Sequence, residues 1–380
     1  MKKNLLAIIF ASFCAGTISA QNISWPEVTT EAKPGARWWW MGSAVNEKDL
    51  NVALEAYQKA GLGGVEITPI YGVRGTEDQF VEYLSPEWVE HFTYTLREAK
   101  RLGLGVDLAN ASGWPFGGPW IDESKASKNM SSKVYRLKGG QTLTDVISYT
   151  QQPLVRMQSN RKLQTTDVKF PLAANQPRQE YAFDQVRYEK ELPLLAVTAN
   201  RISENGFKEV IDLTDKVIEG KLAWTAPEGE WMICALFQGD HGKMVERSGP
   251  GGEGLVIDHF SEDALSTYLN KFDEAFKGKD LSYLRYYFND SYEVDDASGE
   301  SNWTPEFFAE FQKFQGYDLK EYLPALLGLD TSEMNSRILY DYRMTISELL
   351  LDKYTKNWQQ WAARQGKGIR NQAHGSPANV

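Results

Sequence analysis

Apolar runs alternate with helical stretches between residues 36 and 112. Glu47–Ala60 carries its apolar residues near one helical face, and Ser85, followed by Pro86, starts a second helix that Gly103 ends. Three apolar runs have the length and composition of strands buried on both faces: Ala36–Gly42, Val65–Tyr71 and Gly105–Ala109. This succession of strand and helix units predicts parallel strands joined by helical crossovers.

The pattern changes from about residue 131 to residue 239. Helical periodicity gives way there to short β-rich runs, such as Leu192–Val197 and Glu230–Phe237, with Asn205-Gly206 and Glu228-Gly229 as turn signals. We therefore expect an inserted all-β domain, sandwich-like in architecture, which interrupts the parallel units after the third strand.

Strand and helix signals of the first kind return after the insertion. We expect further strands at Gly254–Ile257, Leu284–Phe288 and Gly368–Gln372, and helices at Glu262–Phe276, Pro305–Gln315 and Ser336–Gln365. The fold class is thus predicted to be α/β, a (β/α)8 TIM-type barrel that is incomplete because only about six of its eight strands are found. The expected divisions are a signal peptide at 1–20, the first part of the barrel at 21–130, the inserted domain at 131–250 and the second, truncated part at 251–380.

The first twenty residues have the layout of a signal peptide. Lys2 and Lys3 precede the apolar stretch Leu5–Phe13, which is too short to cross a bilayer, and small residues lead to Ala20. An exported protein without a membrane anchor is predicted, in the periplasm or outside the cell. Only Cys234 remains after cleavage, and its apolar surroundings indicate a buried side chain rather than a disulfide.

Composition narrows the class of partner. The formal net charge of −10 argues against binding to nucleic acid or to anionic membranes. Tryptophan and tyrosine are abundant, with 12 and 18 residues, and both are suited to stacking on the apolar faces of sugar rings or to filling a core. Composition alone leaves these two uses open.

Catalytic residues of parallel α/β barrels lie at the carboxyl ends of the strands. The segment following Leu284–Phe288 places two carboxylates, Asp290 and Glu293, at such an end with no Lys or Arg between them. Their mutual repulsion favours protonation or metal binding of one of them. Glycoside hydrolysis needs a pair of carboxyl groups, which inverting enzymes hold about 6.5–9.5 Å apart. A surface salt bridge is the alternative reading of Glu293.

A loop rich in Gly and Pro, Asn110–Trp120, follows the third strand and displays two tryptophans at the expected barrel mouth, as a sugar platform or as a rim-packing loop. The strand-end rule selects further candidates for substrate contact. His374 could be a hydrogen-bond donor, a general acid or base, or a capping residue. The candidate substrate-binding residues are Trp40, Asp107, Asn110, Trp114, His259 and His374.

Several of these strand-end motifs together resemble those of the α-L-rhamnosidases of glycoside hydrolase family 106. The resemblance covers nearly the whole chain after the signal peptide, in collinear order. The motifs that carry it are Arg37-Trp38-Trp39-Trp40, the Asn110–Trp120 loop, Asp290-Ser291-Tyr292-Glu293 with Asn302-Trp303-Thr304-Pro305, Gly316-Tyr317-Asp318 and Gln372-Ala373-His374-Gly375.

The resemblance implies an inverting hydrolase that releases terminal α-L-rhamnose from plant-type glycans. It implies two catalytic glutamates and a calcium ion at the sugar hydroxyls, with Glu293 matching one glutamate and Asp290 a ligand of the metal or the sugar. The second glutamate is expected beyond Val380, so the role of Glu293 as acid or base stays open. The chain is then either a fragment of a longer gene product or a truncated copy. The rival functions are a non-catalytic carbohydrate-binding protein derived from a truncated glycosidase, and a barrel glycosidase for another sugar.

Overall fold

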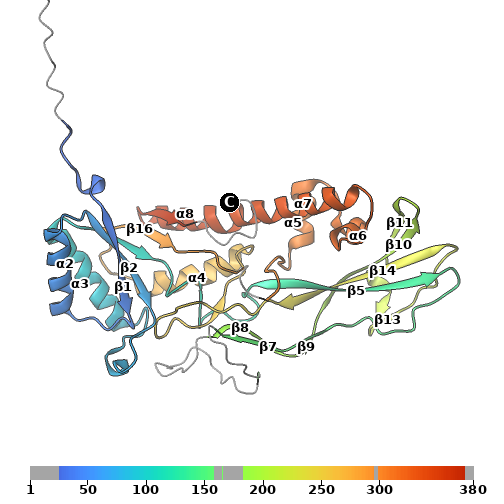
Figure 1. Ribbon diagram of the computed structural model, residues 1–380, viewed down its shortest axis with the longest axis horizontal. Coiled ribbons are helices and arrows are strands. Elements are labelled where there is room, and N and C mark those ends of the chain that lie inside the picture. Colours follow the sequence, from blue (N-terminus) through green and yellow to red (C-terminus); the bar gives the residue numbers. More distant parts are fainter. Residues whose placement is uncertain (1–24, 158–164, 166–182, 295–297, 373–380) are drawn as a thin grey trace, which may run out of the picture.

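The computed structural model describes residues 25–157, 165, 183–294 and 298–372 (Figure 1). The predicted signal peptide and His374 lie outside the described residues. No helix in the described part of the chain has both the length and the apolar character needed to cross a membrane.

A five-stranded parallel sheet forms one end of the molecule. Its strands follow the order β1-β2-β3-β16-β17, and every neighbouring pair is parallel. All residues of β2 and β3 are buried, as their apolar runs predict. The strands are β1 (Gly35–Met41), β2 (Gly64–Ile70), β3 (Gly105–Ala109), β16 (Leu284–Asn289) and β17 (Gly368–Asn371).

Helices cover one face of this sheet. The Ser85 side chain caps the second of them by accepting from the Trp88 backbone N–H, and Gly103 ends it in the left-handed region at φ 71°, as the sequence predicts. Side chains from all four helices join those of the strands in one apolar core, which includes Trp88, Phe92 and Trp358. The helices are α2 (Glu47–Lys59), α3 (Pro86–Leu102), α4 (Glu262–Ala275) and α8 (Lys356–Arg364).

The expected strand at Gly254–Ile257 is not part of the parallel sheet. The structure has only the short β15 (Leu255–Val256), which pairs antiparallel with β4 (Gly117–Gly118). The edge of β3 is occupied by β16, and α4 already supplies the crossover between these two strands. The described residues form an open five-stranded sheet and no closed barrel, so the TIM-type barrel is not confirmed.

The segment between β3 and α4 holds a second, antiparallel sheet. Its four strands follow the order β11-β10-β14-β5, and β10 and β11 form a hairpin across the predicted turn at Asn205-Gly206. These strands are β5 (Lys128–Lys138), β10 (Leu194–Ser203), β11 (Gly206–Asp212) and β14 (Glu230–Asp240). Two-stranded ribbons accompany it: β6 (Thr150–Gln151) with β9 (Lys190–Glu191), β7 (Leu154–Met157) with β8 (Phe183–Arg187), and β12 (Val217–Ile218) with β13 (Lys221–Leu222).

The antiparallel sheet is not one half of a sandwich of two such sheets. One face, which includes the buried Cys234, packs against helices that follow β16 in the chain, and Figure 1 shows them alongside this sheet. The other face packs against loops and ribbons around Leu213 and Trp224. The helices are α5 (Phe307–Gln315), α6 (Leu323–Leu326) and α7 (Met334–Leu349), and a π-helical turn, η6 (Leu350–Thr355), joins α7 to α8.

The expected sandwich therefore needs correction, because helices from a later part of the chain bury the apolar face that a second sheet was expected to cover. The proposed domain boundaries remain predictions. Short 3-10 turns complete the elements: η1 (Thr30–Ala32), η2 (Glu77–Gln79), η4 (Thr214–Lys216) and η5 (Leu319–Tyr322).

Candidate functional site

The face of the parallel sheet opposite the helices carries charged side chains. In the register of β1, β2 and β3, Arg37 lies beside Glu66, and Glu66 beside Asp107. Residues in register on neighbouring strands point to the same face, so these three form one row. Arg37 interrupts the apolar run of β1 because its strand position faces this row and not the helices.

Two further arginines complete an ion network on this face. Arg37 Nε donates to Glu66 Oε1 at 3.0 Å, and Arg370 Nη2 donates to Glu66 Oε2 at 2.5 Å. Arg285 Nε donates to Asp107 Oδ1 at 3.0 Å, while Arg370 also reaches Asp107 Oδ2 at 3.0 Å. The buried carboxylates of Glu66 and Asp107 are thus compensated, as buried charges require.

Asp290 follows the last residue of β16 and joins this network through Arg37. Arg37 Nη1 donates to Asp290 Oδ2 at 2.9 Å, and the amide nitrogen of Gln372 lies 2.6 Å from Asp290 Oδ1. Burial raises the pKa of Asp290, the guanidinium of Arg37 opposes that rise, and the nearby carboxylate of Glu293 adds to it. The raised pKa of Asp290 is consistent with the expectation that these two carboxylates influence each other.

Glu293 is held by two hydrogen-bond donors. Trp114 Nε1 donates to Oε2 at 2.9 Å, and Ser291 Oγ donates to Oε1 at 2.9 Å. The Asn110–Trp120 loop and the segment after β16 therefore meet at this carboxylate, although 179 residues separate Trp114 from Glu293. The two most informative motifs of the sequence form one site at the carboxyl end of the parallel sheet.

The Trp114 loop is anchored to its surroundings through backbone and side-chain bonds. Trp114 and Glu246 form an antiparallel bridge, with Glu246 N donating to Trp114 O at 2.7 Å and Trp114 N donating to Glu246 O at 3.1 Å. Gly113, with φ 80°, passes so close to Glu246 that a Cβ there would lie 1.9 Å from the Glu246 carbonyl oxygen. Gly249 N donates to Ser112 Oγ at 2.6 Å. These contacts fix the position of the indole that binds Glu293.

Comparison with known proteins now bears on this arrangement. The family model for glycoside hydrolase family 106, described as alpha-L-rhamnosidase, matches residues 27–187 and 179–379. The chain belongs to this α-L-rhamnosidase family. The site at Glu293 lies inside the matched region.

Two known proteins are similar to this family member. A Formosa agariphila protein named "Putative beta-glucuronidase" is 28% identical over an alignment that covers 88% of this chain and 29% of that protein. The solved structure of a rhamnosidase from Novosphingobium sp. PP1Y superposes with a TM-score of 0.66 at 20% identity, and the match covers 91% of this chain and 46% of that one. The chain thus spans less than half the length of either protein, and the structural likeness supports the fold.

Trp40 does not reach the site. Its side chain is fully buried on the helix-covered face of the sheet and lies edge-on to Trp88, with ring centroids 5.7 Å apart. Its neighbour Trp39 points to the opposite face, where the Arg37 guanidinium lies 5.1 Å from the ring centroid. Trp39 is 42% exposed and is therefore available to a ligand. Trp40, expected to contact substrate, is thus part of the apolar core.

Asp107 and Asn110 also serve the fold. Both oxygens of Asp107 are taken by Arg285 and Arg370, so this carboxylate anchors the ion network. Asn110 is fully buried, and its Oδ1 accepts a hydrogen bond from Trp358 Nε1 at 2.8 Å. Neither side chain is open to a substrate in this structure.

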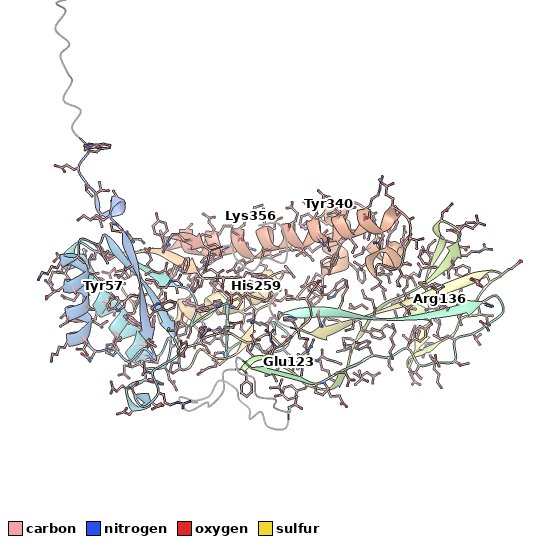
Figure 2. All side chains as sticks on the ribbon, in the orientation of Figure 1. Tyr57, Glu123, Arg136, His259, Tyr340 and Lys356 are labelled. Carbon is pink, nitrogen blue, oxygen red and sulfur yellow. The ribbon has the colours of Figure 1, made fainter. Side chains whose placement is uncertain are left out.

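His259 lies in the interior, whereas Tyr340 and Lys356 project from the outer side of the long helical segment (Figure 2). The His259 ring packs edge-on against Tyr292 and Tyr354, with centroid distances of 4.5 and 4.7 Å. Burial lowers the pKa of His259 to about 3, so the ring stays neutral at physiological pH. The site expectation for His259 is corrected to a packing role.

The family resemblance implies a calcium ion at Asp290. In the described ranges no three His, Cys, Asp or Glu side chains are grouped closely enough to hold a metal ion. Arg37, a cation, already occupies Oδ2 of Asp290. Calcium sites are built from several oxygen ligands. The calcium ion at Asp290 stays a prediction.

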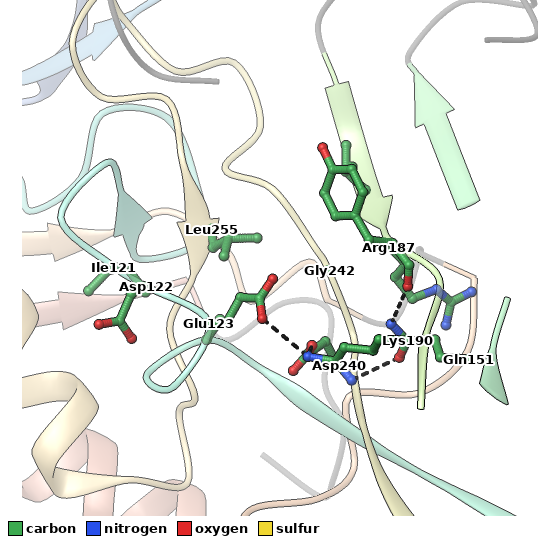
Figure 3. Close-up of a pocket in the computed structure, with 12 residues that line it drawn as sticks. Ile121, Asp122, Glu123, Gln151, Arg187, Lys190, Asp240, Gly242 and Leu255 are labelled. Atoms are coloured by element: carbon green, nitrogen blue, oxygen red, sulfur yellow. Dashed lines mark hydrogen bonds and ion pairs between the residues drawn. The ribbon is translucent and has the colours of Figure 1, made fainter. Parts of the chain in front are cut away.

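A separate pocket of about 230 Å³ lies between the ribbons of the inserted segment and the end of the Trp114 loop (Figure 3). Lys190 crosses it and pairs with Glu123 and Asp240. None of the candidate site residues lines this pocket. It is distinct from the site at Glu293.

Sequence reasoning missed three residues at or beside the site: Arg37, Ser291 and Trp39. Arg37 carried a usable signal, because a charged residue inside an apolar strand must face either solvent or a compensating group. Ser291, two residues before Glu293, was inside a quoted motif without a stated role. The choice between Trp39 and Trp40 had no signal in a run of three tryptophans.

Proposed function

We propose that this protein is a glycoside hydrolase that releases terminal α-L-rhamnose from rhamnose-containing, plant-type glycans. The observation that carries the proposal is the Glu293 carboxylate, which Trp114 and Ser291 orient at the carboxyl end of a parallel sheet. A fixed carboxylate at this position is the group that glycoside hydrolysis requires as general acid or general base. Membership of the α-L-rhamnosidase family supports rhamnose as the sugar.

In the proposed inverting mechanism, one carboxyl group protonates the leaving oxygen while the other activates a water molecule on the opposite face of the sugar. Glu293 supplies one of the two groups. Asp290, three residues before Glu293, is held by Arg37 and Gln372, so its carboxylate helps to fix the segment that carries Glu293. Trp39 offers an exposed ring for stacking on the sugar face.

The test uses the full natural polypeptide and a panel of nitrophenyl glycosides that includes the α-L-rhamnoside. Glu293→Gln is expected to lower kcat by about 10²–10⁴-fold, because it removes an acid or base while keeping the shape of the side chain. Glu300→Gln is the matched control, since Glu300 is an exposed glutamate of the same connecting segment. Turnover that survives Glu293→Gln would sink the assignment.

A β-glucuronide is the second candidate substrate. The name of the Formosa agariphila relative suggests it, and Arg247 supplies a local reason. This exposed guanidinium lies 5.9 Å from the Tyr71 ring centroid at the end of β2 and has no ion pair with any described residue. Arginine binds carboxylates well. Faster hydrolysis of the β-glucuronide than of the α-L-rhamnoside would select this candidate.

Binding of either sugar without turnover would instead favour a non-catalytic carbohydrate-binding protein. Calorimetry with free rhamnose, run beside the hydrolysis panel, separates that outcome from the enzymatic one. We further infer export from the basic and apolar pattern of residues 1–20. Processing of the amino terminus, read by mass spectrometry of the secreted protein, tests this inference.

A further inference from the structure

A buried ion cluster lies behind the Trp114 loop. Its members among the described residues are Asp184, Lys243 and Glu246, with Arg156 at its half-exposed edge, and Lys243 at its centre is fully buried. Lys243 Nζ lies 2.6 Å from Asp184 Oδ1 and also pairs with Glu246 Oε1. Arg156 Nε lies 3.1 Å from Asp184 Oδ2. We call these four residues the Lys243 cluster.

The Lys243 cluster joins the inserted segment to the chain that returns from it. Asp184 belongs to β8, whereas Lys243 and Glu246 lie on the segment that leads back toward α4. Backbone bonds run beside the ion pairs, with Met244 N donating to Asp184 O at 2.8 Å and Val245 N donating to Gly254 O at 2.9 Å. The bond to Asp184 thus holds the returning segment against β8, and the bond to Gly254 closes a turn within that segment.

A continuous set of contacts leads from this cluster to Glu293. Glu246 is the residue whose backbone exchanges two hydrogen bonds with Trp114, and the Trp114 indole donates to Glu293 Oε2. The close passage of Gly113 beside the Glu246 carbonyl leaves no room for the loop to approach further. A shift of Glu246 would therefore move Trp114 and change the hydrogen bond to the carboxylate.

Stability alone does not explain such a cluster. Replacing a buried ion pair by well-packed apolar residues is often neutral or stabilising, whereas the directional bonds of ions fix a geometry. Here the ion pairs fix the position of Glu246 relative to β8 of the inserted segment. Catalytic groups need placement within fractions of an ångström.

We propose that the Lys243 cluster is a positioning device for Glu293, which acts through Glu246 and Trp114. The inference rests on the proposed function of Glu293. It makes Asp184, Lys243 and Glu246 positioning residues, none of which contacts substrate. It also gives the inserted segment a part in the reaction, because β8 supplies the carboxylate that holds Lys243.

The test is a double-mutant cycle on the full natural polypeptide, made with Glu246→Gln and Trp114→Phe. Glu246→Gln keeps the backbone and the size of the side chain while removing its charge. We expect it to lower kcat about tenfold with little change in KM, because a misplaced acid or base weakens the transition state alone. If the cluster acts through Trp114, the double variant has the kcat of Trp114→Phe and no less.

Asp240→Asn is the matched control. Asp240 pairs with Lys128, another buried lysine of the inserted segment, at 2.9 Å. Neither residue belongs to the Lys243 cluster or to the Asn110–Trp120 loop. We expect this variant to lower Tm as Glu246→Gln does and to keep wild-type kcat below its melting range. Hydrogen exchange of a peptide covering residues 110–118 should quicken in Glu246→Gln and stay unchanged in Asp240→Asn.

The outcomes separate this inference from the proposed function. If Glu293→Gln keeps full turnover, the proposed function fails, and the exchange measurement alone then decides whether the cluster holds Trp114. If Glu293→Gln abolishes turnover but Glu246→Gln keeps wild-type kcat, only the positioning role is overturned. Losses of kcat that add independently in the double variant, or that Asp240→Asn reproduces, also overturn it, because they indicate general destabilisation.

Discussion

The two sheets of this molecule use their faces differently. The parallel sheet buries one face under helices, through residues such as Ile67, Leu108 and Tyr287, and leaves the other charged. The antiparallel sheet packs apolar side chains on both faces, with Cys234 on one and Trp231 on the other. Parallel sheets usually have both faces covered by apolar packing. The sheet that departs from this habit is the one that carries the site.

This difference separates stability from chemistry. A face that is not needed for apolar packing can hold charged side chains, and Arg37, Glu66 and Asp107 lie on such a face. The antiparallel sheet contributes no candidate catalytic side chain. The segment that follows β14 contacts the site through the backbone of Glu246, which pairs with Trp114. Mutations in the two sheets should therefore have different kinds of effect.

A large stability effect is expected in the antiparallel sheet. Trp231 is buried, and its Nε1 donates to Pro227 O at 3.0 Å. Trp231→Ala should lower the free energy of unfolding by about 3–5 kcal/mol, because it opens a cavity and leaves that carbonyl without its donor. Urea unfolding measures the change. Ile218→Ala, at an exposed position of the same segment, should change it by less than about 0.5 kcal/mol. A loss of sugar affinity in folded Trp231→Ala would break the separation of roles.

Elements with strong local signals were predictable from the sequence. The apolar runs of β2 and β3, the Ser85 cap and the glycine end of α3 depend on neighbouring residues, and all were confirmed. Gly254–Ile257 shows the limit of such reasoning. Its apolar pattern satisfies a strand, but whether it joins the parallel sheet depends on which segment occupies the edge of β3. That question is decided by long-range pairing.

Site residues follow the same division. Glu293 was selected because the end of a buried strand is visible in the sequence, and the structure brings it to Trp114. Asp107 has the same local signal, yet its partner Arg285 lies 178 residues away, so its anchoring role could not be foreseen. Trp39 and Trp40 differ only in the face to which the strand turns them. Local pattern locates a strand end but does not name the partner of a charge.

A smaller effect is expected from pH at the junction of the two sheets. The pKa of His259 is lowered by burial to about 3, whereas an unfolded histidine titrates near 6.5. Between these values only the unfolded chain takes up the proton, so stability is complete above about pH 6.5 and is lost as pH falls toward 3. From pH 7 to pH 5, this group should cost about 2 kcal/mol.

Comparison of the native protein with His259→Gln isolates this contribution. The variant lacks the titrating ring, so its stability deficit relative to the native protein should shrink by about 2 kcal/mol between pH 7 and pH 5 in urea unfolding. A deficit that stays constant with pH would show that His259 is protonated in the folded state. That result would return the residue to consideration as a site residue.

The smallest expected effect is that of Trp39→Ala on sugar binding, and comparison with Trp40→Ala distinguishes the two faces of one strand. Trp39 and Trp40 are neighbours in β1, but the exposed Trp39 lies beside Arg37 whereas Trp40 packs against Trp88. Trp39→Ala should leave stability nearly unchanged and weaken sugar binding by about 0.5–1.5 kcal/mol, the worth of an aromatic contact. Trp40→Ala should instead lower the free energy of unfolding by about 3–5 kcal/mol and keep the affinity of the folded fraction. Calorimetry and urea unfolding on both variants supply the four values. If Trp40→Ala weakened binding more than Trp39→Ala, the charged face would not be the sugar-binding face.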